Sequence, residues 1–177
     1  MRQSLKLAFC GVVSALSLAL MFMALVIPAL SYTLPAVCGM LLMAVAAEIN
    51  RRAAFAVYIC VDILGFILSP EKSAVILYIL FFGYYPILKS LIEKISARVL
   101  EWAIKILVFN AAAVAVYYTA ALVLTVSNDF FGLSGSAAML LLLGMLNIAF
   151  VLYDVALTKL AALYMLKFHP KIGRFLK

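Results

Sequence analysis

Two acidic residues stand inside long apolar stretches of this chain, which makes them the first candidates for chemistry. Asp62 lies midway along the apolar run from Ala53 to Leu68, and Asp154 lies in the run from Ala137 to Lys167. An aspartate in the middle of a bilayer costs about 2.5–3.5 kcal/mol on the insertion scale, so such residues are functional candidates by default. For both residues we weigh an interhelical hydrogen bond against a ligand contact or a role as proton carrier.

Helical spacing gives Asp62 a set of neighbours. Tyr58, Asp62, Gly65 and Ser69 recur at steps of three and four residues, so they share one face of a helix. This polar, small-residue stripe is expected to face inward. Tyr58, one turn before Asp62, is the expected hydrogen-bond partner of the carboxyl group.

Asp154 has a similar set of neighbours. Asn147, Asp154 and Thr158 share one helical face with Phe150 by the same spacing. Asn110 lies in the preceding apolar run at a depth comparable to that of Asp154. We therefore expect a hydrogen bond between Asn110 and Asp154, and a polar network that comprises Tyr58, Asp62, Asn110 and Asp154.

Aromatic and amide side chains form a further group. It lies toward the ends of the apolar runs that we expect to face the outside of the cell. If the helices form a compact bundle, these residues converge on one side and are candidates for binding a small solute: Tyr32, Tyr78, Tyr117, Asn128 and Asn147. Tyrosine also collects at membrane interfaces without any binding role. Both interpretations stay open for each tyrosine taken singly.

The sequence offers no enzymatic constellation. It carries no Walker loop, HExxH, GxSxG or EF-hand pattern, and its cysteines, Cys10, Cys38 and Cys60, are scattered without a CxxC pair. With a single histidine, His169, in the basic tail, a metal site has little basis. We expect no catalytic residues, no metal and no cofactor.

The elements that position these residues are apolar helices. Of the 177 residues, 69% are hydrophobic, against roughly 45–50% in soluble domains. A spanning helix needs about 20 apolar residues, so we predict an all-α integral membrane protein, a compact bundle of about six transmembrane helices in a single domain over residues 1–177. The predicted helices are Leu7–Ile27, Pro35–Ala47, Ala53–Leu68, Ser73–Leu88, Ile104–Val126 and Ala137–Lys167. Apolar residues at three- and four-residue steps also predict an amphipathic cytoplasmic helix near 88–102, and a basic tail covers 167–177.

The placement of lysine and arginine predicts the orientation. If the N-terminus is cytoplasmic, the inner segments hold Arg2, Lys6, Arg51, Arg52, Lys89, Lys94, Arg98, Lys105, Lys167, Lys171, Arg174 and Lys177. The outer loops then hold only Lys72. Cytoplasmic loops are enriched in these residues, so both termini are expected in the cytoplasm of a multi-pass, bacterial plasma membrane protein. Four spans are the alternative, with the second and third runs as a re-entrant hairpin.

Small residues line one face of the first helix. Gly11, Ala15 and Ala19, together with Ala8, let another helix approach closely. The Ala15-Leu-Ser-Leu-Ala19 segment resembles the Ala-x-x-x-Ala motif of the substrate-binding S components of energy-coupling factor (ECF) transporters, which the chain also resembles in size and topology. The resemblance implies binding of a vitamin-like solute, a lid formed by residues 29–34, docking on a transmembrane coupling subunit, and cytoplasmic ATPases that supply the energy.

Two alternatives remain at this stage. One is a non-catalytic structural or assembly subunit, similar to the rod-shape determining protein D family, in which the polar residues only lock the bundle. The other is a small proton-linked transporter that uses Asp62 and Asp154. In every case the partners are the lipid bilayer and other proteins or a small solute, and not nucleic acid, because the basic residues form no continuous face.

Overall fold

The computed structural model describes residues 3–123 and 136–168, and every regular element in these ranges is a helix. In chain order they are α1 (Gln3–Val26), η1 (Pro28–Leu30), α2 (Thr33–Glu48), α3 (Arg51–Leu68), α4 (Lys72–Leu77), η2 (Tyr78–Phe82), α5 (Tyr85–Ile92), α6 (Arg98–Val123), α7 (Ser136–Leu163) and η3 (Tyr164–Phe168). The element η1 is a 3-10 helix, whereas η2 and η3 are π-helices. The predicted all-helical fold is confirmed for the described residues.

Four stretches of the described residues are long and apolar enough to cross a membrane: Gln3–Val26, Lys72–Ile92, Arg98–Thr119 and Leu143–Lys167. The remaining two long helices are less clear spans. Helix α2 is apolar but has only 16 residues, and α3 carries Arg51, Arg52 and Asp62 within its 18 residues. The chain therefore has the composition of a membrane-embedded helical protein.

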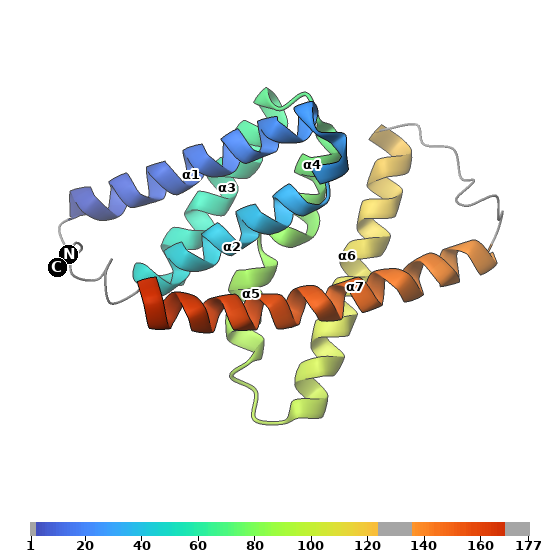
Figure 1. Ribbon diagram of the computed structural model, residues 1–177. Coiled ribbons are helices and arrows are strands. Elements are labelled where there is room, and N and C mark those ends of the chain that lie inside the picture. Colours follow the sequence, from blue (N-terminus) through green and yellow to red (C-terminus); the bar gives the residue numbers. More distant parts are fainter. Residues whose placement is uncertain (1–2, 124–135, 169–177) are drawn as a thin grey trace.

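The helices do not all run alongside one another (Figure 1). Helices α1, α2 and α3 pack together in one group, and α4, η2 and α5 pack against it. Helix α7 runs across α5 and α6 instead of lying parallel to them (Figure 1). As a result, α7 packs against both α5 and α6.

The core consists of two main clusters that share the segment η2–α5. The first cluster joins α1, α2 and α3, and includes Met21, Leu42, Val61 and Tyr78 among its buried residues. The second is aromatic and joins η2, α5, α6 and α7: Phe81, Tyr85, Phe109, Ala112, Phe150 and Leu157. Its centre is the stacked pair Phe109 and Phe150, whose ring centroids lie 4.5 Å apart. The segment 78–92 thus connects the two helix groups.

Much of the outer surface is apolar. Large side chains such as Leu7, Ile67 and Leu107 expose 76%, 70% and 70% of their surface, respectively. Contiguous apolar surface of this kind marks contact with a membrane or with another protein. This distribution agrees with the four candidate spans, which need apolar residues on the side that faces lipid.

The segment near 88–102 differs from the single amphipathic helix that its sequence pattern predicts. Helix α5 ends at Ile92, residues 93–97 form a turn region, and α6 begins at Arg98. One continuous helix would hold Lys89 and Lys105 about 24 Å apart, at about 1.5 Å per residue. Both lysines instead reach the same carboxylate, which requires the chain to reverse direction between them.

Candidate functional site: a buried ion-pair network

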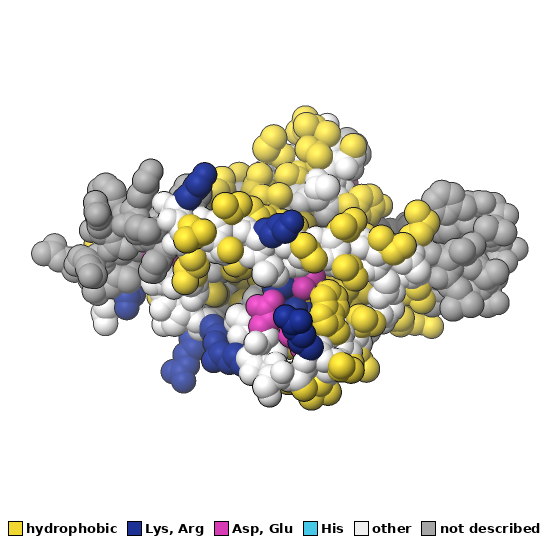
Figure 2. All heavy atoms as spheres, turned by 60° about the horizontal axis from the view of Figure 1, so that its bottom comes forward, with side chains coloured by type: hydrophobic (Ala, Val, Ile, Leu, Met, Phe, Trp, Pro, Cys, Tyr) yellow, Lys and Arg dark blue, Asp and Glu magenta, His cyan; other side chains and the backbone are white. Residues whose placement is uncertain are grey.

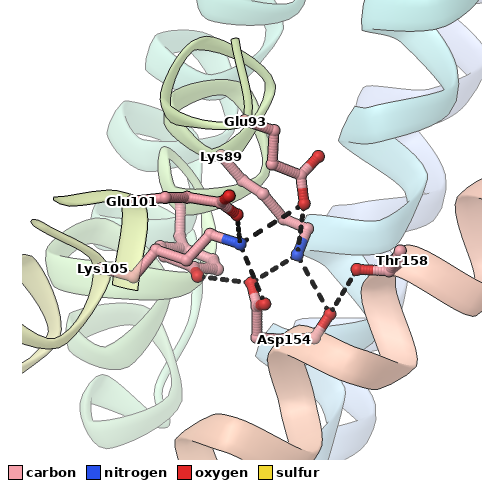
Figure 3. A network of polar contacts seen from close by, with 7 residues as sticks. Lys89, Glu93, Glu101, Lys105, Asp154 and Thr158 are labelled. Carbon is pink, nitrogen blue, oxygen red and sulfur yellow. Dashed lines mark hydrogen bonds and ion pairs between the residues drawn. The ribbon is translucent and has the colours of Figure 1, made fainter. Parts of the chain in front are cut away.

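Asp154, in the second half of α7, is the centre of a buried ionic network (Figure 3). Its Oδ1 atom pairs with Lys89 Nζ of α5, and its Oδ2 atom lies 3.1 Å from Lys105 Nζ of α6. The Tyr85 hydroxyl donates to Oδ1 over 2.6 Å. Lys89, Lys105 and Asp154 expose only 4%, 2% and 3% of their surface. One carboxylate therefore joins three helices through two lysines and a tyrosine.

Two glutamates complete the network at its rim. Glu93 lies 3.0 Å from Lys89 Nζ and 3.4 Å from Lys105 Nζ, and Glu101 lies 2.8 Å from Lys105 Nζ. Figure 2, which looks at the end of the molecule that is lowest in Figure 1, shows acidic side chains reaching the surface among basic and hydrophobic ones. The network thus extends from the buried Asp154 to carboxylates that solvent can reach.

The backbone around Asp154 is part of the same arrangement. Lys89 Nζ also donates to the Asp154 carbonyl oxygen over 3.1 Å, and the Thr158 hydroxyl donates to that oxygen over 3.0 Å. Both lysine amines are thus held by two or more oxygen atoms. The five charged groups carry two positive and three negative charges, which nearly cancel. The network links α5, α6 and α7.

The hydrogen bond predicted between Asn110 and Asp154 is wrong. Asn110 and Asn147 instead exchange two hydrogen bonds of 3.1 Å each between α6 and α7. Asn147 and Asp154 are separated by seven residues, or about 10 Å of helix. Since Lys105 of α6 already occupies the position opposite Asp154, Asn110, further along the same helix, faces Asn147.

The predicted stripe on α3 does face inward. Gly65 and Ser69 are buried, and Tyr58 and Asp62 are half-buried. The Tyr58 hydroxyl donates its proton to the Ile79 carbonyl of η2 over 2.8 Å. Irregular π-helical turns are frequent at functional positions of helices. Here the Tyr58 side chain of α3 forms a hydrogen bond directly with the backbone of the π-helix η2.

Two glycines allow the close approach of η2 to its neighbours. A Cβ atom on Gly39 of α2 would lie 2.3 Å from the Phe82 carbonyl oxygen, and a Cβ atom on Gly83 would lie 2.4 Å from the Tyr58 ring. At both positions only glycine fits without a shift of the surroundings. These contacts fix the position of the π-helix between α2 and α3.

The predicted solute-binding residues are distributed over different environments. Tyr32 is 68% exposed at the start of α2, whereas Tyr78 is completely buried in the first core cluster. Tyr117 lies beside Tyr118 on α6, with ring centroids 5.7 Å apart, and Asn147 pairs with Asn110. Asn128 lies outside the described residues. Tyr32 and Tyr78 thus do not line one open surface.

Lys89 and Lys105 are site residues that reasoning from the sequence did not single out, since it counted them only among the basic residues of a cytoplasmic segment. One signal was present: Glu93 follows Lys89, and Lys105 follows Glu101, each by four residues, the spacing of ion pairs on one helical face. This spacing does not reveal the distant partner on α7. In the part of the chain that the structure describes, no group of three or more His, Cys, Asp or Glu side chains is placed to hold a metal ion.

Comparisons with known proteins assign no relative to this site or to the chain around it. The chain matches no family model, no curated protein and no solved structure.

Proposed function

We propose that this chain is a non-enzymatic membrane subunit that recognises a small solute for uptake and docks on a transmembrane coupling subunit, in the manner of the S components of ECF transporters. The observation that carries the proposal is the face of α1 formed by Ala8, Gly11, Ala15 and Ala19. All four residues are exposed, and a Cβ atom on Gly11 would meet nothing within 4 Å. Since membrane helices associate through such small residues, this face is suited to a partner helix.

The opposite face of α1 already has its partners within the chain. Val13, Ser17, Met21 and Ala24 are buried against the rest of the molecule. The small-residue face is therefore not needed to hold α1 in the fold. Its use by a separate transmembrane protein would leave the intramolecular packing unchanged.

Bulky substitutions on this face test the docking role. Ala15→Leu and Ala19→Leu are expected to abolish co-purification of the coupling subunit and its ATPases with the tagged chain, because added bulk keeps the two backbones apart. The melting temperature of the purified variants should stay within about a degree of the parent's, since both side chains point away from the core.

Ala56→Leu serves as the matched control, because Ala56 is an exposed alanine on α3 that receives the same added bulk. It should co-purify with the partners like the parent. Retention of the ATPases by the Ala15→Leu variant, or their absence from the parent complex, would contradict the proposed function.

The orientation proposed with this function has the first residues of α1 in the cytoplasm. Figure 1 shows that three parts of the chain lie toward the same side of the molecule: the start of α1, the α2–α3 connection and the end of α7. On this side, the Tyr164 hydroxyl of η3 donates a hydrogen bond to the Glu48 carboxylate of α2 over 2.9 Å. This side carries Lys6, Arg51 and Arg52, as the positive-inside rule requires of a cytoplasmic face.

Topology reporters test this orientation. A single cysteine placed near position 3 or position 168 of a cysteine-free variant should react with a membrane-impermeant maleimide only after the cells are opened. A cysteine beside Lys72 should react in intact cells. Labelling of either end of the chain from outside intact cells would reverse the assignment.

Proton-linked transport is a second candidate function, which the buried ionisable groups of the candidate spans favour. Ionisable residues within membrane segments commonly mark ion or proton pathways. Uptake that continues without ATP but stops when the proton gradient is collapsed would favour this candidate over the first.

A further inference from the structure

Where the first helix group meets η2 and α7, the protein contains polar atoms that it leaves without hydrogen-bond partners. Four of them are Ser17 Oγ, Asp62 Oδ1, Tyr78 Oη and Tyr153 Oη, which are contributed by α1, α3, η2 and α7. Burying a hydroxyl or carboxyl group without a partner is costly, and native proteins pair nearly all such groups with protein atoms or ordered water.

Tyr78 joins these atoms into one region. Its side chain is completely buried in the same core cluster as Cys38 and as Val61, the residue before Asp62. Its ring centroid lies 5.9 Å from that of Tyr58.

The other groups connect to this region through α2. The Cys38 thiol donates to the Ser17 carbonyl over 3.5 Å. The Tyr153 hydroxyl lies 3.1 Å from the position that a Cβ atom on Gly39 would take. Ser17 of α1 and Tyr153 of α7 thus approach the neighbouring residues Cys38 and Gly39 of α2 from two different helices.

The charges around this region differ from those around Asp154. Among the described residues, the ion pairs of the molecule involve Asp154, Glu93 and Glu101, and none reaches Asp62. The hydroxyl groups of Tyr78 and Tyr153 each offer one donor and acceptor capacity. A neutral bound molecule that both donates and accepts hydrogen bonds can pair with these hydroxyl and carboxyl groups. Water is the smallest molecule of this kind.

We propose that Asp62, Tyr78 and Tyr153 enclose an internal hydrated site, in which ordered water supplies the hydrogen bonds that the protein does not. The site keeps the Asp62 carboxyl in contact with water although it lies among apolar helices. It does not depend on the docking function proposed above, since α1 contributes to it through its buried face.

Hydroxyl-radical labelling in ¹⁸O-labelled water tests the site on the unmodified protein in detergent. Radicals formed from an adjacent bound water modify a buried tyrosine that bulk solvent does not reach. Tyr78 and Tyr153 are expected to incorporate the label, whereas Phe150, which is 2% exposed within the aromatic cluster, should not. Absence of label from both tyrosines would overturn the proposal.

The sign of a stability change provides the second test. Tyr78→Phe and Tyr153→Phe should each lower the melting temperature by several degrees if the hydroxyl binds water. Removal of an unpaired buried hydroxyl would instead raise it. Tyr85→Phe, which loses the hydrogen bond from the Tyr85 hydroxyl to Asp154, gives the size of the loss for a hydroxyl that has a protein partner. A rise in melting temperature for both Tyr78→Phe and Tyr153→Phe would overturn the proposal even if both variants fold well.

Discussion

Asp154→Asn is expected to cause the largest loss of stability of any single polar substitution in this chain, about 3–5 kcal/mol in the free energy of unfolding. The substitution removes the charge that Lys89 and Lys105 share, and it leaves two buried ammonium groups with carboxylates only at the rim. Breaking a buried ion pair by removing one partner is costly because the remaining charge stays desolvated. Thermal unfolding of the purified protein in detergent would measure the loss.

Two further variants separate this explanation from a general effect of mutation. Glu93→Gln should cost less than about 1 kcal/mol, because the side chain of Glu93 is 40% exposed and solvent screens its charge. Adding Lys89→Met to Asp154→Asn should recover part of the loss by removing one of the unpaired charges. An Asp154→Asn protein that unfolds at the temperature of the parent would show that the network does not lock the three helices.

Gly39→Ala is expected to cost about 1–3 kcal/mol or more, the range of overpacked cores. The new methyl group would lie 2.3 Å from the Phe82 carbonyl oxygen, and this oxygen belongs to the backbone and cannot rotate away. Helix α2 and the π-helix must therefore move apart. Gly83→Ala should also destabilise, because the Tyr58 ring would lie 2.4 Å from the added carbon.

Gly144 provides the matched control for this effect. A Cβ atom there meets nothing within 4 Å, and alanine favours a helix over glycine by about 1 kcal/mol. Gly144→Ala should be neutral or slightly stabilising in the same melting experiment. Equal stability of Gly39→Ala and Gly144→Ala would contradict the close packing of η2 against α2.

Together these residues describe how the two helix groups are joined. The segment 78–92 packs against α2 and α3 at its π-helix and against α6 and α7 at its charged end. Tyr58 holds the first contact through the Ile79 carbonyl, and Asp154 holds the second through Lys89. A change at either point is therefore expected to affect the relative placement of the two groups.

The sequence by itself determined the class of this protein and the inner face of several helices. Long apolar runs form helices because a helix satisfies its own backbone hydrogen bonds, and their approximate limits could be read directly. The stripe from Tyr58 to Ser69 was predictable for the same reason, since spacing along one helix decides which residues share a face. The exposed small-residue face of α1 was also present in the spacing of Gly11, Ala15 and Ala19.

Only the tertiary structure decided which faces meet. Asp154 pairs with Lys89 and Lys105, which are 65 and 49 residues away, because α7 crosses both α5 and α6. Helical periodicity carries no information about a crossing of this kind, so Lys89 and Lys105 read as ordinary cytoplasmic lysines and Asn110 as the partner of Asp154. The complete burial of Tyr78 likewise depends on packing between helices, which the order of residues along one helix does not specify.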